Sequence, residues 1–291
     1  MNKYDNTYFL VNVHTNNNVI VTAYYIIENK RPSIDFNEWI KNFFCLKSRK
    51  VIYTNQYTMN NLFLIMYKNI KKEGDIYIEN LNNSIFIIQE LEDTYIWKNY
   101  NNLMELSEKK DPEIQKGIKH NKYLYTIWNN KSFWLKDTAD IIQADGYYWV
   151  DIGCIRYTSN NDVQSFVKSL NFVNRTHNDK IILSFINTFT MNDLNYVNSI
   201  PQIYYNNNPI IRIQGGFFGG SKKAIIEWCD LYIDELNLFE KYKVFAGKDQ
   251  YIMGSIYLKY QYKFDIFIPS NMKYDECYCN DIWFRFLKAF G

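Results

Sequence analysis

The sequence predicts an α/β fold, a single domain over residues 1–291 with a mostly parallel central sheet flanked by helices. Through the first half of the chain, short β-branched and aromatic runs alternate with segments of helical periodicity, which is the pattern of a parallel sheet. Hydrophobic residues make up 47% of the 291 residues, enough to fill a large core. Neither an internal repeat nor a Pro/Gly/Ser-rich linker divides the chain.

The first elements follow from apolar runs and the turn residues between them. A buried strand is predicted at Val19–Ile27, and a helix capped by Ser33 or Asp35 follows, with apolar positions at helical spacing up to Phe44. Further strands are predicted at Val51–Thr54, Leu62–Tyr67, Ile76–Ile78 and Ile85–Ile88.

Helical patterns occupy the middle of the chain. Leu91–Leu106 is Asn-rich but periodic. The charged run Glu108–Asp111 is predicted to be a solvated helix start. Pro112 then opens a helix at its first position, which carries Tyr125 and Trp128 and breaks near Asn129.

The second half is less regular. Strands are predicted at Tyr147–Val150, Ile181–Ile186 and Ile210–Ile213. After glycines at 215–220, Ser221 caps an amphipathic helix that includes Trp228. A last helix is predicted at Asp281–Ala289.

Charge and cysteine usage narrow the class of protein. Lys+Arg 33 against Asp+Glu 31 leaves a net charge of +2 with no basic stripe, which disfavours nucleic-acid binding. Five Cys, an odd number, and no secretory signal favour a reducing compartment. The longest apolar runs fall far short of the roughly 20 residues of a membrane span. A soluble, cytoplasmic protein is expected, in the host cytoplasm if the gene is viral, and its surplus of aromatic residues would furnish a homodimer interface.

Three constellations could carry chemistry. Asp151 follows an apolar strand, where open α/β sheets bind ligands, although it could simply cap a turn. The block Gly215-Gly216-Phe217-Phe218-Gly219-Gly220 requires a close backbone approach or positive φ, in a binding loop or in two tight hairpin turns. Asp249 and Gln250 lie at a helix start, where a carboxylate is stabilised by the helix dipole, in a ligand site or as plain capping.

Together these motifs resemble the HtrL/YibB-like family of glycosyltransferases. The resemblance spans roughly residues 19–260. It rests on Trp149-Val-Asp-Ile-Gly-Cys-Ile-Arg156, the glycine block up to Ser221, Trp228 and Asp249-Gln250, together with the first two strands and Asn129-x-Lys131. It implies a GT-A-like domain with a nucleotide-binding part over about residues 1–155 and an acceptor-side part over about 156–291.

The resemblance also implies roles for individual residues. Thr22, Ala23 and Tyr24 would line the nucleotide-base pocket. Lys131 would meet the donor diphosphate or ribose, and Arg156 would stabilise the departing diphosphate. Asp151, with Gly153 in its Asp-Ile-Gly motif, would bind metal and ribose. Gly215, Gly216, Gly219 and Gly220 would approach the transferred sugar, and Asp249 and Gln250 would face its anomeric carbon.

The expected reaction moves a hexose or N-acetylhexosamine from a nucleoside diphosphate, expected to be UDP, to a glycan, lipid-linked or protein acceptor. Mn²⁺ or Mg²⁺ is the expected cofactor. However, Asp-x-Asp is replaced by Asp151-Ile152-Gly153, so a second ligand would come from Asp275, Glu276 or Asp281, or the metal is weakly held. His14, His120 and His177 have no His or Cys partner at metal-ligand spacing, which disfavours zinc. A nucleotidyltransferase and a non-catalytic glycan-binding protein are the alternatives.

Overall fold

A computed structural model describes residues 18–27, 33–46, 48–73, 83–156, 179–205 and 210–267. The strand predicted at 76–78 and the helix predicted at 281–289 lie outside these residues, as do the proposed second metal ligands at 275, 276 and 281. Within the described residues, no helix combines the length and the apolar character needed to cross a bilayer.

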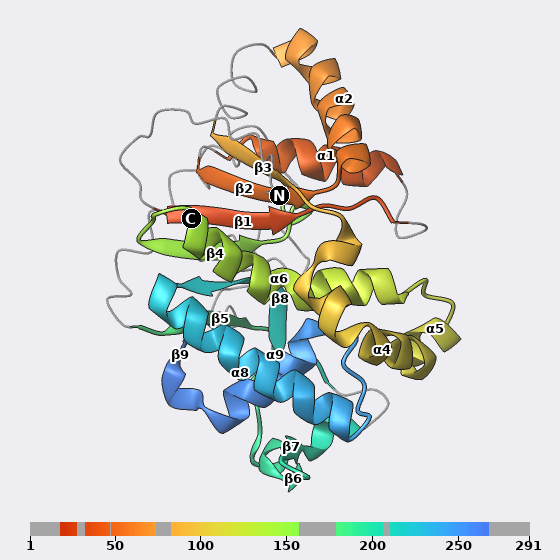
Figure 1. The fold of residues 1–291 in the computed structure, drawn as a ribbon, viewed down its shortest axis with the longest axis vertical. Coiled ribbons are helices and arrows are strands. Elements are labelled where there is room, and N and C mark those ends of the chain that lie inside the picture. Colours follow the sequence, from red (N-terminus) through yellow and green to blue (C-terminus); the bar gives the residue numbers. More distant parts are fainter. Residues whose placement is uncertain are drawn as a thin grey trace, which may run out of the picture.

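Seven strands form the central sheet, in the order β3-β2-β1-β4-β8-β5-β9 (Figure 1). They are β1 (Asn18–Ala23), β2 (Arg49–Thr54), β3 (Ser84–Ile88), β4 (Gly146–Val150), β5 (Ile181–Phe185), β8 (Ile213–Gly220) and β9 (Phe264–Phe267). Strands β3, β2, β1 and β4 are parallel, β8 is antiparallel to both of its neighbours, and β5 pairs in parallel with β9. The predicted fold class, an α/β fold with a mostly parallel sheet, is confirmed and is consistent with a GT-A-like domain.

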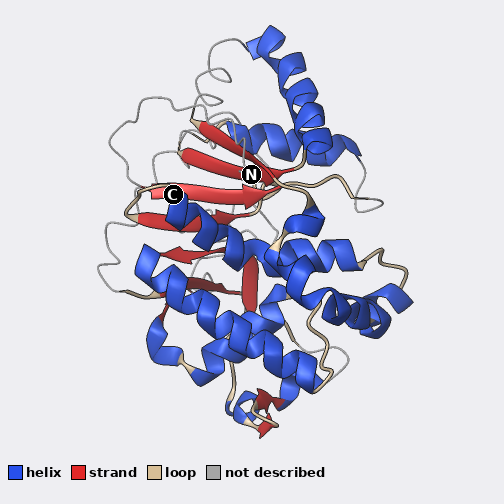
Figure 2. Cartoon of the chain, in the orientation of Figure 1, coloured by secondary structure: helices blue, strands red, loops and turns tan. Residues whose placement is uncertain are grey.

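Helices cover both faces of this sheet (Figure 2). The α-helices are α1 (Ser33–Phe44), α2 (Gln56–Glu73), α4 (Tyr95–Lys110), α5 (Pro112–Gln115), α6 (Lys122–Ile141), α8 (Lys222–Lys241) and α9 (Asp249–Lys259). Short 3-10 helices are η1 (Leu91–Asp93), η3 (Met191–Leu194), η4 (Gln202–Tyr205) and η5 (Gln261–Lys263). Strands β6 (Tyr196–Val197) and β7 (Ile200–Pro201) form a separate small hairpin.

Alternating residues of each strand divide the core into two layers. Val21 and Trp149 face a large cluster shared with α4, α6, α8 and α9, whereas Ile20 and Tyr148 face a smaller one shared with α1. Both faces of the strands are therefore apolar, which explains why they appear in the sequence as continuous rather than alternating hydrophobic runs.

One predicted strand, Leu62–Tyr67, is wrong because these residues belong to α2. Leu62 is fully buried while Phe63 and Leu64 are exposed, which is the burial pattern of one helix face. A short apolar run alone does not distinguish a strand from a helix segment.

The helix predicted to start at Pro112 and to break near Asn129 is also divided differently. Pro112 does occupy the first turn of α5, but α5 ends before Gly117, whose φ is +84°. A new helix, α6, is capped by Asn121 and continues through Asn129 to Ile141. The Asn129 amide does not break α6, because buried groups of other elements satisfy it.

Candidate functional site

The candidate site lies at the point where the strand order reverses. From β1 the chain proceeds outward to β2 and β3, and then returns to place β4 on the other side of β1. In open α/β sheets, ligands bind outside the carboxyl ends of the strands at such a switch point. Val21 pairs with Trp149, so Ala23 and Asp151, each two residues further on, leave the sheet at the same edge.

Lys131 connects three of the predicted site segments. Its Nζ lies 2.8 Å from the Gly215 carbonyl oxygen, to which it donates a hydrogen bond, and 2.9 Å from Asp249 Oδ2. Asp151 Oδ1 lies 3.3 Å from the same nitrogen. The Lys131 and Asp249 side chains are only 4% and 3% exposed, whereas Asp151 is 35% exposed. The site therefore has a buried pair, Lys131 and Asp249, and one carboxylate, Asp151, that is open to a ligand.

Burial and charge act in opposite directions on these groups. Burial alone lowers the pKa of the Lys131 ammonium, but the Asp151 and Asp249 carboxylates outweigh burial and raise it. Burial raises the pKa of the Asp249 carboxyl, and the Lys131 charge opposes that rise. Lys131 is therefore a permanent positive charge at neutral pH, placed between two carboxylates.

The structure fixes Asp151 through the strand that delivers it. The indole N–H of Trp149, two residues earlier on β4, donates to Asp151 Oδ1 at 2.7 Å. The Asp151 backbone N–H donates to the Gly216 carbonyl oxygen at 3.0 Å. The Lys131 ammonium also lies 5.5 Å from the centre of the Trp149 ring. One oxygen of Asp151 is thus held by the protein's own donors.

The glycine block forms strand β8 instead of a loop or hairpin turns. At Gly215 a Cβ atom would lie 2.6 Å from Asp249 Oδ2, so the Asp249 carboxylate occupies the space of a side chain. The predicted close approach at Gly215 is therefore to Asp249. Gly219 and Gly220 pair with Tyr148 and Tyr147, toward the amino end of β4. They lie about 14 Å or more along β8 from Gly215, and the structure does not bring them to the candidate site.

Gln250 follows Asp249 in the first turn of α9 and is half-buried. Its backbone N–H donates to Asp249 Oδ1 at 3.0 Å. The Asp249 carboxylate therefore accepts a hydrogen bond from a backbone N–H at the start of the helix and also contacts Lys131. The predicted placement of both residues at a helix start is confirmed.

Of the remaining predicted residues, Tyr24 and Gly153 lie beside α1, whereas Ala23 belongs to the large core cluster on the opposite face of the sheet. Thr22 is fully buried, Ala23 is nearly so, and the half-buried Tyr24 ring lies 5.4 Å from the Phe36 ring of α1. A Cβ atom at Gly153 would lie 2.8 Å from Phe36, so the turn after Asp151 packs directly on this helix.

Arg156 continues the same surface. Its guanidinium stacks 4.4 Å from the centre of the Trp39 ring, and its Nε–H donates to the Gly153 carbonyl oxygen at 3.4 Å. An aromatic and cationic surface of Tyr24, Phe36, Trp39 and Arg156 thus adjoins Asp151.

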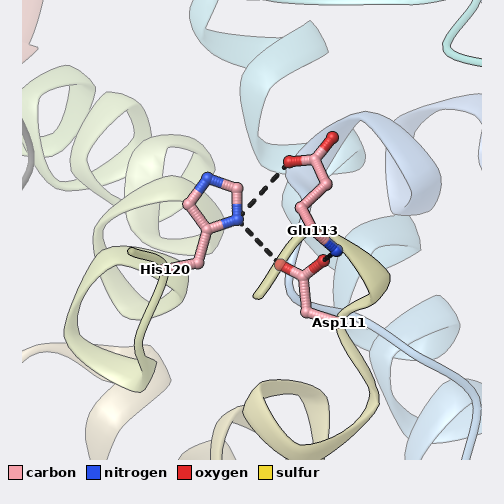
Figure 3. Close-up of side chains that lie close together, drawn as sticks. All are labelled: Asp111, Glu113 and His120. Atoms are coloured by element: carbon pink, nitrogen blue, oxygen red, sulfur yellow. Dashed lines mark hydrogen bonds and ion pairs between the residues drawn. The ribbon is translucent and has the colours of Figure 1, made fainter. Parts of the chain in front are cut away.

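A second polar cluster, missed by the sequence analysis, consists of Asp111, Glu113 and His120 (Figure 3). His120 Nδ1 lies 2.8 Å from Asp111 Oδ2 and 3.5 Å from Glu113 Oε2. These are the described residues whose His, Cys or carboxylate groups gather closely enough to hold a metal ion. Tyr125 donates to Asp111 Oδ2 at 2.6 Å.

The environment of Asp111 corrects one prediction. Its side chain is fully buried, so Asp111 does not belong to a solvated helix start as expected. Burial alone would raise its pKa, but hydrogen bonds from His120, Tyr125 and the Glu113 backbone N–H lower it to about 2. The sequence did carry a signal for this role, because Asp111-Pro112-Glu113 is a typical helix N-capping pattern and Asp111 caps α5.

No protein-family model matches the chain, and no curated protein matches it.

Proposed function

We propose that this chain is a glycosyltransferase that moves a hexose or N-acetylhexosamine from a nucleoside diphosphate, UDP in the first instance, to a glycan, lipid-linked or protein acceptor. The observation that carries the proposal is the meeting of Lys131, Asp151, Gly215 and Asp249 at the strand-order switch point. These segments are up to 118 residues apart, counted from Lys131 to Asp249. The resemblance to the HtrL/YibB-like family implies that these residues share one donor site.

The donor's nucleotide would occupy the side of the crevice formed by β1 and α1. Tyr24 and Phe36 offer ring faces for a base, and Arg156 offers a guanidinium for the diphosphate. The sugar would then lie toward Gly215, Asp249 and Gln250. This orientation follows the order in which the residues are placed around Asp151.

Asp151 fits a divalent cation that is shared with the donor. Its carboxylate is 35% exposed at the edge of the sheet, and one of its oxygens already accepts from Trp149. Mg²⁺ is usually held by one or two carboxylates together with substrate phosphates, and not by an all-protein cage. A bound cation would offset the negative charge that develops on the diphosphate as the sugar leaves.

The chain's own residues supply the remaining electrostatics. Positive charge develops at the anomeric carbon as the sugar–phosphate bond breaks, and the Asp249 carboxylate stabilises it. Lys131 favours the ionised form of Asp249 against the effect of burial, and Gly215 leaves room for that carboxylate beside the strand. With a donor bound, the aromatic side chains beside Asp151 would help to exclude water, which would otherwise take the sugar.

A donor screen tests the proposal. The protein is incubated with UDP-, GDP- and CMP-sugars and Mn²⁺, and nucleotide release is followed. We expect UDP-sugar turnover that falls about 10²-fold or more in Asp151→Ala. Asp145→Ala is the matched control, because Asp145 is exposed just before the opposite end of β4.

Three outcomes would count against the transferase. Pyrophosphate release from a nucleoside triphosphate would favour a nucleotidyltransferase. Binding of free sugar without nucleotide or cation would favour a glycan-binding protein. Equal activity of the two Asp variants would remove Asp151 from the site.

A further inference from the structure

The segment that delivers Asp249 is held from behind by side chains of three other helices. Ser107 of α4 accepts from the Ala246 backbone N–H at 3.0 Å, and the Asn129 amide of α6 donates to the Ala246 carbonyl oxygen at 2.9 Å. The third contact comes from α5, where Glu113 Oε1 lies 2.8 Å from Lys248 Nζ. Lys248 immediately precedes Asp249 and is the N-cap residue of α9.

Lys248 is an unusual residue for this position. Helix N-caps favour Ser, Thr, Asp and Asn, whose side chains accept from the first helical N–H groups. The N-cap of α9 makes no such side-chain hydrogen bond. Instead the Lys248 side chain is only 8% exposed and reaches to Glu113. A buried ammonium requires a partner, so the start of α9 is fixed by a tertiary ion pair and not by a cap.

The pair extends to the helix that carries Lys131. Glu113 Oε2 lies 3.5 Å from His120 Nδ1, which lies 2.8 Å from Asp111 Oδ2 (Figure 3). Asp111 Oδ2 accepts from Tyr125 of α6 at 2.6 Å. The chain of contacts therefore runs from the residue before Asp249 to the helix that positions Lys131.

We propose that Glu113 and Lys248 are positioning residues for the transfer reaction. Their ion pair, in which Lys248 is buried and Glu113 is 26% exposed, is supported by His120 and Asp111. It sets the first turn of α9 and holds the Asp249 carboxylate against Lys131 and Gly215. The link to turnover rests on the function proposed above, whereas the link to the conformation of α9 does not. Two separate measurements therefore test them.

Hydrogen exchange measures the conformational link without substrate. Glu113→Gln preserves the shape of the side chain and removes its charge, and Lys248→Met removes the ammonium. We expect either variant to accelerate amide exchange in the first turn of α9 by about tenfold or more, because Glu113→Gln leaves the buried Lys248 ammonium without its counter-charge and Lys248→Met removes the ion pair. The matched control is Lys259→Met, since Lys259 pairs with buried Glu235 at the other end of α9. That variant should accelerate exchange in the last turn only.

Donor turnover measures the functional link. In Glu113→Gln we expect kcat to fall about 10²-fold, the loss that a 1 Å misplacement can cause, with KM for the UDP-sugar within twofold of the wild type. Lys259→Met should lower stability and leave kcat unchanged. A charge-reversed pair, Glu113→Lys with Lys248→Glu, should recover part of the lost kcat.

The outcomes separate the two claims. Unchanged exchange at the first turn of α9 in both variants overturns the positioning role. Accelerated exchange together with no turnover of any donor by the wild type leaves the positioning role standing and rejects the proposed function. Elemental analysis with and without EDTA is the third arm. A tightly bound metal whose removal alters exchange at α9 would show that Asp111, Glu113 and His120 are ligands, and would overturn the ion-pair assignment.

Discussion

Replacing Lys131 by Met tests the electrostatic centre of the candidate site directly. The substitution keeps a long apolar side chain in α6 and removes the ammonium that lies 2.9 Å from Asp249 Oδ2. With an effective dielectric constant of about 20, two unit charges at this distance attract by about 6 kcal/mol, much of which offsets their desolvation. Breaking a buried pair by removing one partner costs about 3–5 kcal/mol, because the other charge is left uncompensated.

The loss in free energy of unfolding caused by Lys131→Met should grow as pH rises. Asp249 already has a raised pKa from burial, and losing Lys131 raises it further. In the variant, the native state therefore binds a proton that the unfolded chain releases above a pH of about 4. Consequently the free energy of unfolding falls as pH rises from about 4 to the folded pKa, and Lys131→Met is closest to the wild type in acid.

Urea unfolding followed by tryptophan fluorescence measures both effects. Lys136→Met is the control, because Lys136 lies on the same helix, is 38% exposed and pairs with exposed Asp140 at 3.5 Å, so it should cost within about 0.5 kcal/mol. Lys131→Met with Asp249→Asn should be more stable than the sum of the single variants by about 1–3 kcal/mol. A loss below about 1 kcal/mol for Lys131→Met, or strict additivity of the pair, would falsify the buried ion-pair arrangement.

Three further predictions concern stability. Burial lowers the pKa of Lys50 to about 7, so between pH 7 and about 10 the unfolded chain binds one proton more than the native state. The free energy of unfolding of the wild type should therefore rise by up to about 1.4 kcal/mol per pH unit over this range. Urea unfolding of Lys50→Met should show no such rise. Gly219→Ala should cost about 3 kcal/mol or more, measured by the same unfolding, because the new Cβ would lie 2.2 Å from the Tyr147 carbonyl oxygen. Ser221→Ala should cost about 1 kcal/mol in the shift of the urea midpoint, because the Ser221 hydroxyl accepts from the Ala224 backbone N–H at the start of α8; an unchanged midpoint would show that this cap contributes nothing.

The sequence was sufficient for several buried strands, but not for β8 or for Leu62–Tyr67, which belongs to α2. Val51–Thr54 and Tyr147–Val150 are buried on both faces, and the mostly half-buried Ile85–Ile88 continues the sheet beside them, so these apolar runs are strong strand signals. The structure does bring Asp151, Gly215 and Asp249 together around Lys131, whereas Gly219 and Gly220, expected at the same place, lie at the other end of β8.

What the sequence could not supply were the tertiary partners that override local preference. The Asn129 amide looks like a helix breaker until Tyr232 and the Ala246 carbonyl oxygen satisfy it. The glycine block looks like a turn until it is seen that neighbouring backbone and the Asp249 carboxylate fill the places of its side chains. Both errors come from contacts more than 30 residues distant in the chain, which no local pattern encodes.

The charge at the crevice gives a reason to expect a cation with the donor. Lys131, Asp151 and Asp249 together carry two negative charges and one positive charge. Lys131 and Asp249 are both buried, at 4% and 3% exposed, so the Asp151 carboxylate, at 35%, is the charge most open to a ligand. An incoming diphosphate would meet the exposed Asp151 carboxylate. Two like charges about 4 Å apart repel by about 4 kcal/mol at an effective dielectric constant of about 20. Arg156 offers one compensating charge at the turn that follows. Calorimetry should therefore show weak binding of UDP alone and tighter binding with Mn²⁺, and Asp151→Asn should strengthen the metal-free binding while abolishing the gain from Mn²⁺. If Asp151→Asn weakened UDP binding both without and with Mn²⁺, Asp151 would contact the nucleotide directly, through its ribose, and not through a shared cation.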